Sequence, residues 1–94
     1  MNKHTATNPT TGRVYTRNSK TRTYSHVVVA DFYYTDGRVA AVVLGGQYDA
    51  PQFGTWTSRL DLAEKAMRKL TSDFGVLPLD IAKFEVQILE AEVA

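Results

Sequence analysis

The densest run of apolar residues is TYSHVVVADFYY, at residues 23–34. Val, Tyr and Phe dominate it, and these residue types favour a β-strand. Asp36-Gly37 follows, and this dipeptide is typical of a two-residue hairpin loop. The return strand then spans Val39 to Leu44. With Asp36-Gly37 as the loop, Tyr34 would lie opposite Val39.

Both faces of this predicted hairpin are apolar. Side chains alternate between the two faces of a strand. One face would therefore carry Tyr24, His26, Val28, Ala30, Phe32, Tyr34, Val39, Ala41 and Val43. The other would carry Val27, Val29, Asp31, Tyr33, Ala40, Val42 and Leu44.

A helical period follows the hairpin. Leu60, Ala63, Met67, Leu70 and Phe74 recur at steps of three and four residues, which places them on one stripe of a helix. Such a narrow stripe can cover one face of a small sheet.

The two ends of the chain differ in pattern. Residues 81–93 alternate polar and apolar positions and then shift by one, which favours a strand with a bulge. A helix capped by Asp80 is the alternative. Residues 1–12 are polar and contain Asn8-Pro9 and Gly12, so we expect a flexible tail there. Residues 13–17 form a short strand, and residues 13–94 form one domain.

These elements predict an α+β fold of the order β-β-β-α-β, a small antiparallel sheet with one long helix packed on one face. The second face of the hairpin would remain uncovered. Monomeric proteins rarely expose an apolar patch of several hundred Å². A second copy related by two-fold symmetry would cover it most simply, and the tail or the loop of residues 45–57 could cover it instead.

Composition limits the classes of function. The chain has 94 residues, a net charge of +1 and no cysteine. Disulfides and thiolate metal sites are therefore excluded, and a reducing, cytoplasmic compartment fits. No run approaches the length of a membrane span, and the first residues lack the apolar segment of a signal peptide.

Enzyme and metal signatures are near background. His26 and Asp31 lie on opposite faces of one strand, so they cannot form a dyad there. An enzyme would need a pocket that joins His26 to Glu85 or Asp49. Two histidines without cysteine make a poor metal set, and the glycines do not form a phosphate loop. We expect no enzyme activity, no metal and no cofactor.

Two surface features could bind a macromolecule. Residues 1–30 carry five basic residues and no acidic one. Arg13, Arg17, Lys20 and Arg22, interleaved with Tyr15 and Tyr24, could hold phosphates and stack bases, or could equally form a solvated strand edge. In the loop, Tyr48 and Phe53 are candidate contact residues, whereas Trp56 is expected to cap the core.

Three segments resemble small uncharacterised accessory proteins from phages of actinobacteria: NPTTGRVYTR, TRTYSHVVVADF and WTSRLDLAEKA. The resemblance implies a viral protein made in an infected bacterial cell, one that binds a host component.

Together these observations predict a non-enzymatic protein-binding module that forms a homodimer. Its contact residues would be Tyr48, Phe53, Val27, Val29, Tyr33 and Val42. A nucleic-acid-binding protein is the alternative.

Overall fold

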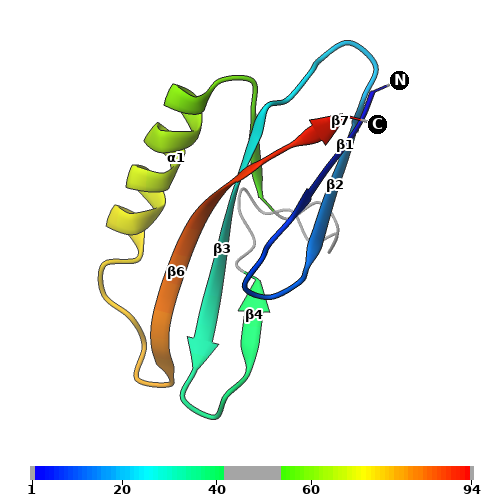
Figure 1. Ribbon diagram of the computed structural model, residues 1–94. Helices are drawn as coiled ribbons and strands as arrows, with labels where there is room; N and C mark the ends of the chain where they lie inside the picture. The colour runs from blue at the N-terminus through cyan, green and yellow to red at the C-terminus, as the bar shows by residue number, and fades with distance from the viewer. Residues whose placement is uncertain (1, 42–53, 94) are drawn as a thin grey trace.

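The computed structural model describes residues 2–41 and 54–93. Its elements follow the chain in this order: β1 (Asn2–Thr7), β2 (Val14–Ser19), β3 (His26–Tyr34), β4 (Val39–Ala41), β5 (Thr55–Thr57), α1 (Leu60–Asp73), β6 (Ile81–Glu90) and β7 (Glu92–Val93). The predicted α+β class is confirmed, with one helix packed against strands of antiparallel sheets (Figure 1).

The larger sheet is built around β3. β6 pairs with β3 along one edge, from His26↔Glu90 to Tyr34↔Ile81. β4 and β5 share the other edge of β3, with β5 at its start and β4 at its end. The strand predicted for residues 81–93 is confirmed, and it breaks at Ala91 where β6 ends and β7 begins. The bulge expected at Ile88-Leu89 is wrong, because the register is continuous from Lys83 to Glu90 and shifts instead between Ile81 and Lys83.

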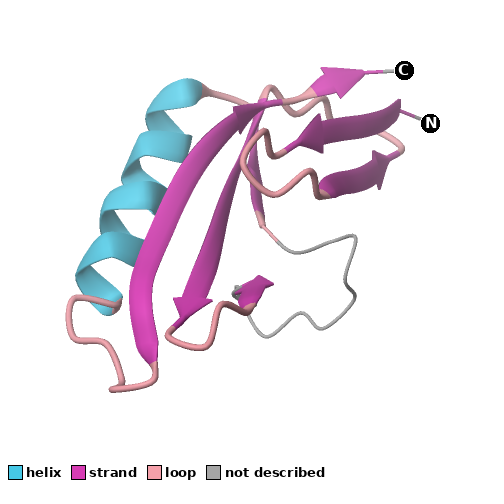
Figure 2. Ribbon diagram, turned by 60° about the horizontal axis from the view of Figure 1, so that its bottom comes forward, coloured by secondary structure: helices cyan, strands magenta, loops and turns pink. Residues whose placement is uncertain are grey.

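The smaller sheet has the order β2-β1-β7. β1 pairs with β2 along its whole length and with β7 only at His4↔Val93 and Thr5↔Glu92. Because β7 continues directly from β6, one long strand joins the two sheets. Figure 2 shows this strand bending from the helix side of the molecule toward β1.

The helix covers one face of the larger sheet. Phe32 of β3, Phe84 of β6 and Phe74 after α1 form an aromatic cluster, with ring centroids 4.8–5.5 Å apart. Contacts of this kind contribute beyond the area that they bury. The stripe predicted for the helix thus meets the face that carries Phe32.

The opposite face is covered by the β1–β2 hairpin. Ala6 of β1 and Tyr15 of β2 pack on Val27, Val29 and Leu89 in one core cluster, against which Trp56 also packs, as expected for that residue. Figures 1 and 2 place β3 and β6 between α1 and this hairpin. The expectation of an uncovered second face is therefore wrong, and the alternative that the N-terminal segment covers it is confirmed by the place of Ala6 in this cluster. The candidate contact residues Val27 and Val29 are 0% and 1% exposed, and cannot form a surface.

Residues 2–7 are the reason for that error. They were expected in a flexible tail, but they form β1, and His4, Ala6 and Asn8 are buried. Threonine favours strands, and every second residue of a strand points to the same face. In this polar segment those residues are His4, Ala6 and Asn8, which point into the protein.

The turn between β3 and β4 also differs from the prediction. Tyr34 N–H donates to the Arg38 carbonyl at 2.8 Å, so the loop consists of Thr35, Asp36 and Gly37. Gly37 has a φ of 93°, as the last residue of such a loop requires. Val39 therefore pairs with Tyr33 instead of Tyr34, and the side chains of β4 exchange faces.

Candidate protein-interaction site

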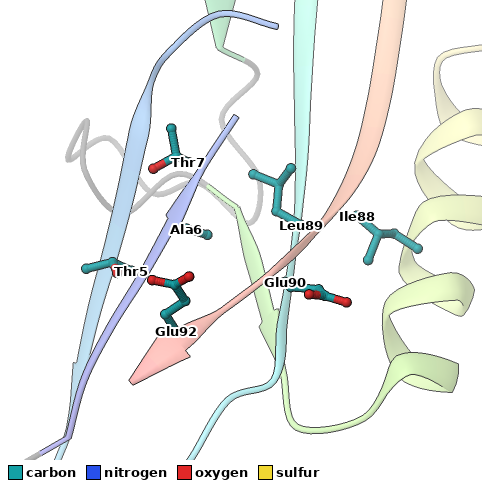
Figure 3. Close-up of a pocket in the computed structure, with 7 residues that line it drawn as sticks. All are labelled: Thr5, Ala6, Thr7, Ile88, Leu89, Glu90 and Glu92. Carbon is teal, nitrogen blue, oxygen red and sulfur yellow. The ribbon is translucent and has the colours of Figure 1, made fainter. Parts of the chain in front are cut away.

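A cavity of about 360 Å³ opens where β1 and β6 separate. Thr5, Ala6 and Thr7 line it from β1, and Ile88, Leu89, Glu90 and Glu92 line it from β6 and β7. We call it the β1–β6 wedge. Figure 3 shows that the two strands lie together at Thr5 and Glu92 and diverge beyond them.

The first wall of the wedge presents main-chain groups of Thr7, which pair with no strand among the described residues. Asn8 N–H donates to the Arg13 carbonyl at 2.9 Å, so the even residues of β1 direct their main-chain groups toward β2. An antiparallel ladder alternates, and Thr5 and Thr7 must therefore direct theirs toward the other edge. Thr5 pairs there with Glu92, whereas the described residues place no strand opposite Thr7.

The second wall is the outer edge of β6, where main-chain groups alternate in the same way. Ala91 N–H donates to the Ser25 carbonyl at 2.8 Å, so the odd residues of β6 direct their main-chain groups toward β3. The N–H and C=O groups of Ile88 and Glu90 must then point into the wedge. Within the described residues, no strand pairs with this outer edge of β6.

The floor of the wedge is apolar and its rim is acidic. Ala6 and Leu89 are 4% and 8% exposed, and both belong to the core cluster. Figure 3 shows Leu89 projecting toward β1, while Ile88 and Glu90 point toward the helix side. Glu90 and Glu92 are exposed carboxylates at the same end of the cavity.

A buried polar cluster lies between the two sheets, near the turn after β1. Asp31 is 1% exposed, and its Oδ2 accepts a hydrogen bond of 3.3 Å from Asn8 Nδ2. Its Oδ1 and the Tyr15 hydroxyl have no hydrogen-bond partner among the described residues. Burial raises the pKa of Asp31, Arg13 opposes the rise, and Glu85 adds to it.

Asp31 and Glu85 differ in their partners. They are cross-strand neighbours, but Glu85 accepts bonds from Lys83 at 2.7 Å and from Gln87 at 2.8 Å. The ion pair with Lys83 lowers the pKa of Glu85. The described residues contain no group of three or more side chains suited to hold a metal ion.

Both histidines form hydrogen-bond contacts within the fold. His26 contacts the Ser25 hydroxyl at 2.7 Å. It lies at the start of β3, whereas Glu85 pairs with Asp31 in the middle of that strand. His4 is fully buried, and its Nε2 accepts the Tyr24 N–H at 2.9 Å. Its Nδ1 therefore carries the proton and donates to the Arg17 carbonyl at 3.1 Å.

The four basic candidates do not form one patch. Arg13 lies at the turn end of the β1–β2 hairpin, near Asp31. Arg17 lies toward the opposite end, with its guanidinium carbon 5.6 Å from the Tyr24 ring centroid, and Lys20 and Arg22 follow β2. The expectation that Tyr15 takes part in base stacking is wrong, because its side chain is 1% exposed.

A second cavity, of about 500 Å³, lies at that opposite end. Arg22, Thr23 and Tyr24 line one part of it. Trp56, Thr57, Ser58 and Leu62 line the rest. It joins one cation to two aromatic side chains, of which Tyr24 is 9% exposed.

Of the remaining predicted contact residues, the structure describes Tyr33 alone. Tyr33 is half-buried, with the Lys83 amine 5.3 Å from its ring centroid. Val42, Tyr48 and Phe53, and with them Asp49, lie outside the described residues.

The most exposed apolar side chains among the described residues were not among the predicted contact residues. Val76 and Leu79, between α1 and β6, are 93% and 102% exposed. Pro78 lies between them. These residues follow Phe74 of the aromatic cluster in the sequence. The wedge was missed too, because it depends on the placement of β1 beside β7.

No helix in the described part of the chain has the length and apolar character needed to cross a membrane. Comparison of the chain with protein-family models, with curated proteins and with solved structures gave no match.

Proposed function

We propose that this protein is a small, non-enzymatic module that binds another protein along the open edge of β6. The observation that carries the proposal is the open main-chain edge at the β1–β6 wedge: Thr7, Ile88 and Glu90 direct N–H and C=O groups into one cavity, and no strand of the described residues pairs with them. A row of unpaired groups is a template for an added strand.

The candidate contact surface differs from the one expected from the sequence. The hairpin face that was expected to bind a second copy is filled by β1 and β2. The strand edge offers main-chain hydrogen bonds in its place. The resemblance to phage accessory proteins suggests a host protein as the partner, and a second copy of the chain could use the same edge.

A proline variant tests this proposal. Proline lacks the N–H group and is tolerated at strand edges where that group faces away from the ladder. Glu90 meets both conditions, because it is exposed and its N–H points away from β3. Glu90→Pro should therefore preserve the fold and prevent strand addition.

The control is Ala82→Pro, an exposed position at the bulge of the same strand, at the end remote from the wedge. Tagged wild-type protein and both variants would be incubated with nuclease-treated actinobacterial lysate. We expect a protein that wild type and Ala82→Pro retain and Glu90→Pro does not. Equal retention by all three, with circular dichroism showing intact folds, would refute strand-edge binding.

Nucleic-acid binding is a second candidate, favoured by the cavity that joins Arg22 to Tyr24 and Trp56. Arg17, whose guanidinium carbon lies 5.6 Å from the Tyr24 ring centroid, adds positive charge beside it. If this function holds, affinity for single-stranded oligonucleotides falls steeply with salt, and Arg22→Glu abolishes binding. Arg59→Glu, an exposed change that does not line the cavity, is the control.

A further inference from the structure

We infer that the β1–β6 wedge takes an extended peptide segment that carries a lysine or arginine, and that Glu90 and Glu92 select it by charge. The inference rests on the proposed function and names the chemistry of the partner. It begins from the arrangement of the wedge, with main-chain groups on its two walls, an apolar floor and an acidic rim.

The walls set the backbone conformation of the ligand. Thr7 presents an N–H and a C=O group from one side, and Ile88 and Glu90 present theirs from the other. An extended chain can meet the row on β6, because its own N–H and C=O groups alternate between its two edges; β1 lies too close to β6 at the closed end of the cavity for one strand to pair with both. Beyond the end of β1, the edge of β6 continues past Val86 and would pair with the rest of the segment.

The floor and rim set the side chains. Alternate side chains of an added strand would point toward Ala6 and Leu89, where a small or β-branched apolar group can be accommodated. The other side chains would lie on the side of Ile88 and Glu90. A basic side chain there meets the carboxylate of Glu90, and Glu92 lies at the same end of the cavity.

Charge also distinguishes a basic peptide from a second copy of the chain. The only basic residue of β6 and β7 is Lys83, and it is already paired with Glu85 at 2.7 Å. A second β6 would therefore bring Glu85, Glu90 and Glu92 to a rim that is itself acidic. Like charges brought together across an interface disfavour that pairing.

The probe is a displayed library of random peptides, selected on the complete protein. We expect enrichment of alternating apolar sequences with lysine or arginine. For a selected peptide measured by fluorescence anisotropy, Glu90→Lys and Glu92→Lys should each weaken binding roughly tenfold. Glu90→Pro should weaken it at least as much, since it removes a main-chain donor.

Two controls separate charge from position. Glu64→Lys makes the same change on the exposed surface of α1, away from the wedge, and should leave affinity within about twofold. Ala82→Pro should do the same. Methylation of the central peptide nitrogens should abolish binding, because it removes the donors of an extended strand.

Several results would overturn the inference. They are a failure to enrich basic peptides, unchanged affinity in Glu90→Lys and Glu92→Lys, and sedimentation of the protein as a dimer that Glu90→Pro returns to monomer. If a lysate protein is lost in Glu90→Pro but kept by both lysine variants, strand-edge binding stands and the basic-peptide inference alone fails.

Discussion

Asn8 Nδ2 lies 3.3 Å from Asp31 Oδ2, and this buried hydrogen bond links the turn after β1 to the middle of β3. Asn8 also organises its own turn, because its Oδ1 accepts the Thr10 N–H at 2.9 Å and the Thr11 N–H at 3.4 Å. One side chain therefore shapes the β1–β2 turn and fastens it to the larger sheet.

Replacing Asn8 should destabilise the fold. Asn8→Ala removes these bonds and leaves the buried Asp31 carboxyl without a partner, for which we expect a loss of about 2–3 kcal/mol in the free energy of unfolding. Urea denaturation would measure it. Asn18→Ala, at an exposed position of β2, is the control and should change stability by less than about 0.5 kcal/mol. Equal stability of the two variants would contradict the role of Asn8.

Asp31 should make stability depend on pH. Burial raises its pKa above the ordinary value of 3.8, so folding favours the neutral acid. The stability that this gives is fully present below 3.8 and is lost as the pH rises through the raised pKa of the folded state. Burial has the largest effect on the pKa of Asp31. The charge of Arg13 lowers this pKa and the charge of Glu85 raises it, and the pKa remains above its ordinary value.

The variant Asp31→Asn tests that sign. It keeps the shape of the side chain and stays neutral, so its stability relative to wild type should increase between about pH 4 and pH 7. Urea denaturation at a series of pH values would show a widening difference between the two proteins. A difference that does not change with pH would mean that Asp31 does not titrate in this range with a raised pKa.

The sequence predicted those elements whose signals are local. The spacing of apolar residues from Leu60 to Phe74 predicted the helix α1. The alternation of polar and apolar residues after Ile81 predicted the strand β6. The hairpin register was wrong by one residue, because Asp-Gly suits two loop lengths and only the Tyr34–Arg38 bond distinguishes them.

The strand β1 was missed for a different reason. Its buried residues include His4 and Ala6, and neither has a strong preference for strands. They are buried because β3 and β6 offer an apolar face and β2 and β7 offer partners, which no short window reveals. The same dependence on tertiary pairing concealed the wedge, whose walls come from Thr7 and Ile88.

Two glycines should respond differently to alanine. Gly37 has a φ of 93° with open space around its α-carbon, so Gly37→Ala should cost only the backbone strain, about 1 kcal/mol. Gly54 has a φ of 123°, and an added Cβ would lie 2.8 Å from Val27 Cγ2 and 3.1 Å from the Val28 carbonyl oxygen. Gly54→Ala should therefore be the more damaging change. Thermal denaturation of both variants would rank them, and the reverse order would contradict the close packing at Gly54.

The segment after the helix should separate stability from surface function. Phe74 contacts Phe32 and Phe84 at ring distances of 5.5 and 4.8 Å, so Phe74→Ala should lower the free energy of unfolding by about 1–3 kcal/mol. Leu79 is 102% exposed and gains nothing from burial within the chain. Leu79→Ser should therefore change stability by less than about 0.5 kcal/mol, as measured by urea denaturation. A large loss in Leu79→Ser would show that the segment packs against the molecule, since an exposed leucine contributes to folding only when it is removed from water.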